Sequence, residues 1–234
     1  MTSGTVVMQR ELRRVDGAGF HVRVIAAARS AENAAALRRD VARWGQETAD
    51  YTLRHAQRTL SRETLEHARF AVQVLVRAAA ALTLPEGTGP GVLVAEHGDE
   101  VVGVAIFRLT GGRGYLDWLT VAPRYQVGSA TPAAEQVAGI GSTLVCAAAA
   151  RMALAGVTAV QIDPLDPEAE RFWGGRGFRW NADDTHMVAD GAEAATRLAS
   201  ACGTYEDRTA QGECIGCRVR MTGNSWRRFV RSRV

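Results

Sequence analysis

The residues best suited to chemistry lie between a predicted strand and a predicted helix. The run Gln136–Gly141, read Gln-Val-Ala-Gly-Ile-Gly, follows the apolar segment Tyr115–Val121 and precedes a stretch of small residues. Glycine lets the backbone approach a ligand closely, and the first amides of a helix are unsatisfied donors at the positive end of its dipole. A pyrophosphate would fit there. The spacing alone is a weak signal, because glycine turns often precede helices.

A dinucleotide-binding Rossmann fold is not indicated. That fold would place G-x-G-x-x-G after the first strand and an acidic residue about 20 positions further on, and the chain has neither. The strands before the glycine run are instead joined by short turns and predict an antiparallel meander. These strands are Val92–Glu96, Val101–Phe107 and Tyr115–Val121.

Two long helices are predicted ahead of the meander, within residues 30–84. They follow a strand at Phe20–Ala26, and Ser30 and Ser61 are suited to cap them. Both helices have an apolar stripe. His55 and His67 lie within them, and a histidine in such a position is more often a packing or surface residue than a catalyst.

The chain beyond the glycine run predicts a crossover. A helix over Gly139–Ala155 leads into the strand Val157–Ile162, and strand–helix–strand passages imply parallel pairing. Asp166 and Pro167 suit the cap and first position of a shorter helix. We predict a mixed α/β sheet of about six or seven strands with helices on both faces.

Three motifs in this order resemble those of the GNAT superfamily of N-acetyltransferases, over residues 20–190. The first is Leu119–Pro123, which matches a Leu-x-Val-x-Pro strand end. The second is Gln136–Gly141, which matches (Gln/Arg)-x-x-Gly-x-(Gly/Ala). The third is Asp166–Trp173, which matches Asn-x-x-Ala-x-x-Phe-Tyr and is followed by Gly177-Phe178.

The resemblance implies a function and a mode of binding. It implies acetyl transfer from acetyl-CoA, a co-substrate, directly to an amine. The strand at Leu119–Val121 would splay from Val157–Ile162, and its freed backbone groups would bond the pantetheine. The coenzyme-binding residues implied are Leu119, Thr120, Val121, Gln136, Val137, Ala138, Gly139, Ile140, Gly141, Ser142, Thr143, Asp166, Phe172 and Trp173.

The chain departs from the family pattern at two of these positions. Trp173 replaces a tyrosine that often protonates the leaving thiolate, and an indole is a very poor acid. Asp166 replaces an asparagine, and its charge would oppose a phosphorylated ligand unless it caps a helix. Residues 124–134 replace a short basic link and are either a substrate loop or a plain insertion.

Two carboxylates are candidates for accepting the proton of the amine. Asp117, in the strand that would splay, is the first choice, and Glu96, at the end of a neighbouring strand, is the second. Partial burial would raise the pKa of such a carboxyl group toward neutrality. Simple strand alternation would also allow Asp117 to face solvent.

Metal binding is not expected from the cysteines. Cys202, Cys214 and Cys217 supply one C-x-x-C pair without a second, and tetrahedral zinc wants four ligands. Zinc and a disulfide remain the alternatives to ordinary thiols. Cys146 lies in the predicted small-residue helix and reads as a core residue.

The composition is typical of a globular chain, and its C-terminal residues are strongly basic. Its 28 basic residues are all arginine, which fits a GC-rich genome or avoidance of lysine modification. Residues 218–234 carry six arginines and no acid, although the chain has a net charge of +3. We divide the chain into a lead at 1–19, the GNAT-like domain at 20–190 and an extension at 191–234, with a short strand near Arg218–Met221.

These features lead to one primary interpretation and one alternative. The primary interpretation is an acyl-CoA-dependent N-acyltransferase that acts on a small-molecule or protein amine. We expect a cytoplasmic protein with no membrane span, and a homodimer is compatible with the sequence. Delivery into another cell is the less favoured localisation. The alternative is a non-catalytic acetyl-CoA-binding module whose arginine-rich tail engages nucleic acid or an acidic partner. Nucleic acid is the less favoured partner of the tail.

Overall fold

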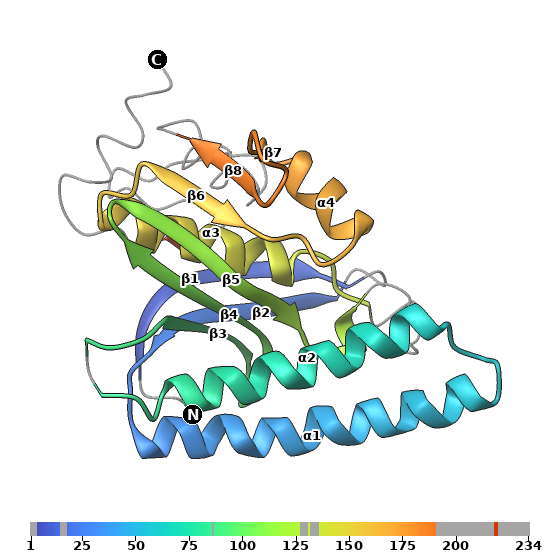
Figure 1. Cartoon of the computed structure of the whole chain (residues 1–234). Coiled ribbons are helices and arrows are strands. Elements are labelled where there is room, and N and C mark those ends of the chain that lie inside the picture. The colour runs from blue at the N-terminus through green and yellow to red at the C-terminus, as the bar shows by residue number, and fades with distance from the viewer. Residues whose placement is uncertain are drawn as a thin grey trace.

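A single mixed sheet organises the protein. The computed structural model describes residues 4–14, 18–85, 87–126, 131, 136–190 and 218–219. Their strands form one nine-stranded sheet in the order β7-β8-β6-β5-β4-β3-β2-β1-β9 (Figure 1). The strands are β1 (Gly4–Arg13), β2 (Gly19–Ala27), β3 (Gly91–His97), β4 (Glu100–Thr110), β5 (Arg113–Val121), β6 (Ala159–Ile162), β7 (Arg179–Trp180), β8 (Met187–Asp190) and β9 (Arg218–Val219).

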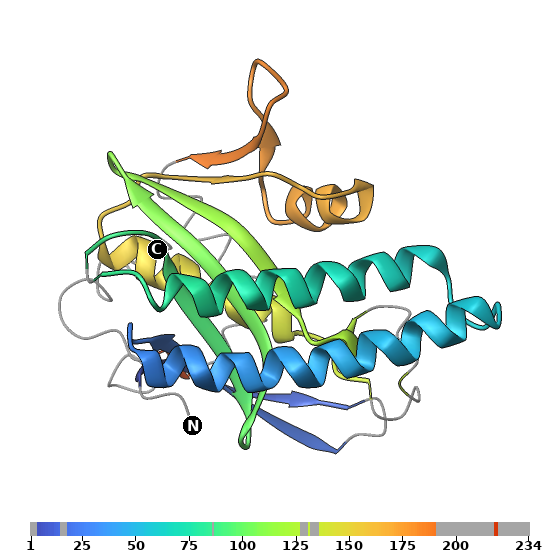
Figure 2. The ribbon, with the colours of Figure 1, turned by 60° about the horizontal axis from the view of Figure 1, so that its bottom comes forward.

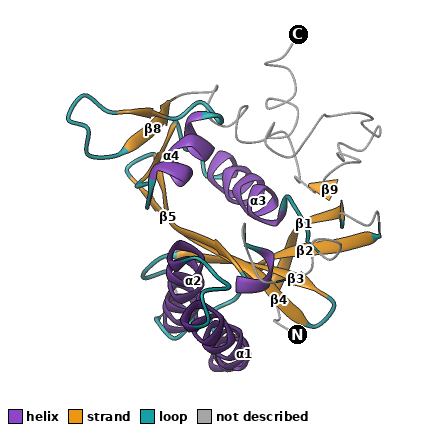
Figure 3. Ribbon diagram, turned by 90° about the vertical axis from the view of Figure 1, so that its right-hand side faces the viewer, coloured by secondary structure: helices purple, strands orange, loops and turns teal. Residues whose placement is uncertain are grey.

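Helices cover both faces of this sheet, which confirms the predicted architecture. The long helices α1 (Ala31–Ala56) and α2 (Arg62–Ala81) lie on one face, while α3 (Ile140–Leu154) and α4 (Pro167–Gly174) lie on the other (Figure 3). A 3-10 turn, η1 (Pro123–Tyr125), follows β5. No helix in the described part of the chain is both long and apolar enough to cross a membrane.

The three predicted helix caps are confirmed. Ser30 Oγ accepts a hydrogen bond from the amide of Asn33 at 3.0 Å, and Ser61 Oγ accepts one from Thr64 at 3.1 Å. Asp166 Oδ1 accepts from the amide of Ala169 at 2.7 Å. Each cap satisfies one of the amide donors that the first turn of a helix leaves without a partner.

Small residues let α3 pack very closely on the sheet. Buried alanines and Leu144 fill the space between this helix and the strands. Gly114 of β5 shows how close the approach is, because a Cβ there would lie 2.6 Å from Met152 Sδ. A second core, including Trp44 and Leu75, packs α1 and α2 against the other face. Helices therefore pack closely on both faces of the sheet.

The sheet has more strands than the sequence predicted. The lead contributes β1, which pairs antiparallel with β2, and β9 pairs with β1 at Met8 and Gln9. A bulge at Val7 interrupts the alternation of β1, and both Val7 and Met8 are buried. A strict period of two, the usual signal of a strand, is thus absent there.

The two central strands part in the middle of the sheet. Strand β5 pairs in parallel with β6, and this register runs from Arg113 opposite Ala159 to Tyr115 opposite Gln161. β5 then continues to Val121 without a strand on that side among the described residues, and the two ribbons diverge (Figure 2). The predicted splay is confirmed. It leaves backbone donors and acceptors along one edge of β5 open to a ligand.

Candidate functional site

A large cavity occupies the gap between the diverging strands. Its volume is about 1300 Å³, and it is bounded by β5, the segment after β6, the N-terminus of α3, one face of α2 and the start of α4. A cavity of this size can hold a large part of a cofactor-sized ligand. The place where the sheet opens is therefore also the place where the fold offers a binding site.

Most residues that the resemblance assigned to the coenzyme line this one cavity. They come from three separate segments and are Leu119, Thr120, Val121, Gln136, Val137, Ala138, Gly139, Ile140, Gly141, Ser142, Asp166, Phe172 and Trp173. Thr143 does not line it, because its side chain is fully buried and its Oγ1 donates to the carbonyl of Gly139 at 2.8 Å.

The glycine run forms the N-terminal end of α3. Gly139 is the N-cap residue with φ of 101°, a left-handed conformation that favours glycine. Its carbonyl accepts the first helical hydrogen bond, from Thr143. The amides of the first turn of a helix precede that bond and have no partner within the helix. A Cβ built at Gly141 would lie 3.9 Å from Leu119 and Val121, which is ordinary van der Waals contact, so a small side chain fits at this position.

Arg176 adds a cation beside this helix terminus. Its Nη2 donates to Ser142 Oγ at 2.9 Å, its Nη1 donates to the carbonyl of Phe172 at 2.8 Å, and its guanidinium carbon lies 3.4 Å from the centroid of the Phe172 ring. Burial lowers the pKa of Arg176, and no carboxylate bonds it in the described part of the chain. A half-buried arginine without an acidic partner is suited to an anionic ligand.

Strand β1 brings two further arginines to the same region. Arg10 Nη1 donates to Thr143 Oγ1 at 3.4 Å. Arg14 forms an isolated bridge with Val137, and its Nε is buried without a hydrogen-bond partner. No sequence pattern indicated Arg10, Arg14 or Arg176, because they are distant in the chain from the glycine run and carry no motif of their own.

Asp166 joins α4 to α2 across the cavity. While its Oδ1 caps α4, its Oδ2 lies 2.9 Å from Nε2 of His67, a residue of α2 that also lines the cavity. The carboxylate is therefore engaged on both oxygens. His67 is 99 positions away in sequence, and its pattern on an amphipathic helix gave no indication of this pairing.

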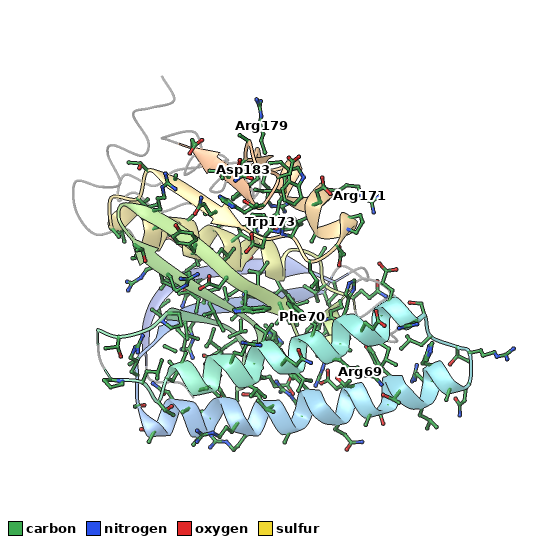
Figure 4. The ribbon with its side chains drawn as sticks, viewed as in Figure 1. Arg69, Phe70, Arg171, Trp173, Arg179 and Asp183 are labelled. Carbon is green, nitrogen blue, oxygen red and sulfur yellow. The ribbon has the colours of Figure 1, made fainter. Side chains whose placement is uncertain are left out.

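Trp173 packs as an aromatic wall. It is buried, and its ring centroid lies 4.9 Å from that of Phe172 and 5.2 Å from that of Phe178, both in edge-on arrangements. Figure 4 shows it turned inward from α4, in contrast to the exposed Arg171. These contacts indicate that Trp173 forms part of the cavity wall by packing against its aromatic neighbours.

Asp117 lies at a bulge in β5, at the point where the strands part. Ile106 is opposite Trp118 and Phe107 is opposite Leu116, so Asp117 is the extra residue and simple alternation does not apply. Its carboxylate lines the cavity and is bonded twice by Arg108, at 2.7 Å from Nε and 2.7 Å from Nη2. These bonds raise the pKa of Arg108.

Glu96 does not share this site. Its side chain is buried in the sheet and forms an ion pair with Arg23 of β2, with 2.6 Å between Arg23 Nη2 and Glu96 Oε2. It does not line the cavity. The two candidate carboxylates are therefore not brought together. A register shift between Ala95 and Glu96 interrupts the pairing of β3 with β4, and the side chain of Glu96 bonds to Arg23 of β2 instead of facing the cavity.

The cysteine cluster lies outside the described residues, as does the arginine tail apart from Arg218 and Val219 of β9. Cys146 is buried in α3, as predicted, and is disulfide-bonded. Among the residues that the structure describes, no group of three or more His, Cys, Asp or Glu side chains is arranged to hold a metal ion.

No family model matches the chain, and no curated protein sequence matches it. Solved structures do resemble it. The PaiA N-acetyltransferase of Thermoplasma acidophilum, in complex with coenzyme A, is 15% identical with a TM-score of 0.45, over 72% of this chain and 98% of that one. A GNAT-family protein of Desulfovibrio desulfuricans is 19% identical with a TM-score of 0.41, over 71% and 96%. Ard1 of Thermoplasma volcanium is 17% identical with a TM-score of 0.35, over 51% and 79%.

The solved structures that resemble this chain include GNAT-family and N-acetyltransferase proteins. Since each TM-score is below 0.5, these likenesses carry no argument about activity. The case for a GNAT-type function therefore rests on the splayed strands, the α3 terminus and the residues of the cavity.

Proposed function

We propose that this protein is a GNAT-type N-acetyltransferase that binds acetyl-CoA in the cavity and transfers its acetyl group to an amine. One observation carries the proposal. The open edge of β5 beyond Tyr115 and the N-terminal end of α3 at Gly139–Ser142 face the same cavity. An extended amide chain ending in a pyrophosphate needs both features at once.

The residues of the cavity fit such a ligand. The open edge of β5 can bond pantetheine amides, and Gln126 Nε2 already donates to the carbonyl of Val121 at 3.2 Å, which shows that an amide donor can reach this edge. The amides of Ile140, Gly141 and Ser142 would hold the pyrophosphate. Arg176 would supply a positive charge beside them. Phe172 and Trp173 would pack against the apolar part.

Acetyl-CoA would supply an activated acyl group as a thioester. In the reaction the amine nitrogen bonds to the acetyl carbon, the carbon–sulfur bond breaks, and the sulfur leaves as a thiolate. The amine must first lose a proton to a group of the protein or to water. The thiolate takes its proton from solvent or from the acceptor, because Trp173 offers no acid.

The structure alters the preference between proton acceptors. Asp117 is bonded twice by Arg108, so both of its oxygens already accept hydrogen bonds from a guanidinium. His67 lines the cavity. When its Nε2–H donates a hydrogen bond to Asp166, Nδ1 is the ring nitrogen with a free lone pair. We therefore assign proton acceptance to His67, directly or through water, and binding of the ammonium group to Asp117.

Transfer is tested by incubating the full chain with acetyl-CoA and a broad panel of amines while free thiol and acetylated product are measured. The proposal predicts thiol release that depends on an amine and matches the product formed. Acetyl-CoA binding without turnover of any amine would instead favour the non-catalytic binding module, which the packing role of Trp173 allows. Absence of acetyl-CoA binding would refute both.

A further inference from the structure

The wall that α2 contributes to the cavity carries aromatic rings and a cation. Phe70 and Arg77 reach it from α2, and Trp118 reaches it from β5. The ring centroids of Phe70 and Trp118 are 5.6 Å apart. The guanidinium carbon of Arg77 lies 4.8 Å from the centroid of Trp118. Figure 4 shows Phe70 on the side of α2 that faces the sheet.

The available charge on this wall is positive. Arg108 and Asp117 neutralise one another through two hydrogen bonds. Arg77 is exposed and, in the part of the chain that the structure describes, has no carboxylate within salt-bridge distance. Of the other two carboxylates of the cavity, Asp163 belongs to the segment between β6 and α4, and Asp166 meets α2 at His67 with both of its oxygens already hydrogen-bonded.

We propose that this wall is the acceptor subsite and that it selects an amine whose apolar or aromatic body also carries an anionic group. The proposal rests on the proposed function and names its substrate class. The body of the acceptor would pack against Phe70 and Trp118. Its anionic group would pair with Arg77, and its ammonium group would lie at Asp117 beside the point where β5 and β6 part.

Other acceptor classes fit this wall poorly. A polyamine would bring several positive charges to Arg77 and Arg108, with one partly neutralised carboxylate to receive them. A neutral sugar amine would leave Arg77 without an anion. An aromatic amino acid or an aminoalkyl benzoate matches all three groups.

Matched ligands test this inference by calorimetry on the full chain loaded with coenzyme A, which prevents turnover. The pairs are phenylalanine with phenylalaninamide, and 4-(aminomethyl)benzoate with 4-methylbenzylamine, with spermidine as the polycation. At least one acid is expected to bind about tenfold more tightly than its partner without a carboxylate, since a charge-assisted hydrogen bond is lost in the latter. Spermidine is expected to bind more weakly than that acid.

Two variants identify the cause of the preference. Arg77→Gln is expected to reduce the difference within the pair to about twofold by weakening the acid alone. Arg69→Gln is the matched control, because Arg69 is exposed on the same helix, adjacent to Phe70, and does not line the cavity (Figure 4). It is expected to leave both affinities unchanged.

The inference would be overturned if the amines without a carboxylate, or spermidine, bound as tightly as the acids. No binding by any acid, or a preference that survives Arg77→Gln, would also overturn it. Coenzyme A binding is measured first. If it is absent, the proposed function fails separately, and the same titrations on the free protein still decide whether the wall selects anionic amines.

Discussion

Asp117 and Arg108 form a two-point ion pair at the place where the central strands separate, with 2.7 Å between each pair of bonded atoms. A β-bulge places Asp117 there as the extra residue of β5. The pair favours a binding role for the carboxylate over a basic one, because both of its oxygens already accept hydrogen bonds from the guanidinium.

Replacing Asp117 with Asn is therefore expected to weaken binding of the amine and to spare the chemical step. KM for the amine should rise about tenfold, the effect of removing one charged hydrogen bond, with kcat changed by less than about threefold. Steady-state kinetics with saturating acetyl-CoA measure both constants. A large fall in kcat with an altered pH profile would instead make Asp117 the base.

The His67–Asp166 pair predicts the opposite pattern. His67→Gln should lower kcat by about a hundredfold and leave KM for the amine nearly unchanged, because the proton acceptor is lost. Steady-state kinetics at saturating acetyl-CoA measure both constants. His55→Gln serves as the control, since His55 lies on α1 and does not line the cavity. An unchanged kcat in His67→Gln, or an equal fall of kcat in His55→Gln, would exclude this role.

Arg176 is expected to contribute to coenzyme binding and not to the stability of the ligand-free protein. Burial lowers the pKa of its guanidinium, and its buried Nε has no hydrogen-bond partner, so the charge is poorly compensated without a ligand. Arg176→Met should weaken acetyl-CoA binding about tenfold or more, since a charge-assisted contact is lost, without lowering the Tm of the ligand-free protein.

The matched control is Arg171→Met, an exposed position on α4 that is expected to change neither quantity. Calorimetry with acetyl-CoA and thermal unfolding of the free protein give the two readouts. A fall in Tm with unchanged coenzyme affinity would show that Arg176 acts in the fold alone.

Gly139 and Gly141 should respond differently to substitution although they are two positions apart. Gly139 has a φ of 101°, and an added Cβ would lie 3.1 Å from Leu12. Gly139→Ala should therefore reduce the free energy of unfolding by about 1 kcal/mol or more. Gly141→Ala adds a Cβ at ordinary van der Waals distance within α3 and should be at least as stable as the wild type. Denaturant unfolding compares them, and equal stability of the two variants would contradict the account of this turn.

Local sequence patterns predicted the parts of the fold that depend on neighbouring residues. The caps at Ser30, Ser61 and Asp166 involve a donor three positions away, and each is present. The crossover from α3 into β6 and the splay followed from element order and from the motif resemblance. These features require no knowledge of distant contacts.

The features that sequence reasoning missed depend on distant partners or on bulges. A bulge at Val7 hides the alternation of β1, and a bulge at Asp117 makes its direction unreadable from alternation. Glu96 looked available for catalysis, but its partner Arg23 lies on β2, a strand paired with β3 across the sheet. His67 gained its place in the cavity through a residue 99 positions away.

The central claim is that the α3 terminus and the open edge of β5 bind acetyl-CoA. Calorimetric titration of acetyl-CoA into the wild type and into Gly141→Glu tests it most directly, with Gly141→Ala as the control for added bulk. A carboxylate there would project toward the space beside Leu119 and Val121 and repel the pyrophosphate. The account predicts binding by the wild type and the Ala variant and loss of binding by the folded Glu variant. Unchanged affinity in Gly141→Glu, or no binding by the wild type, would contradict it.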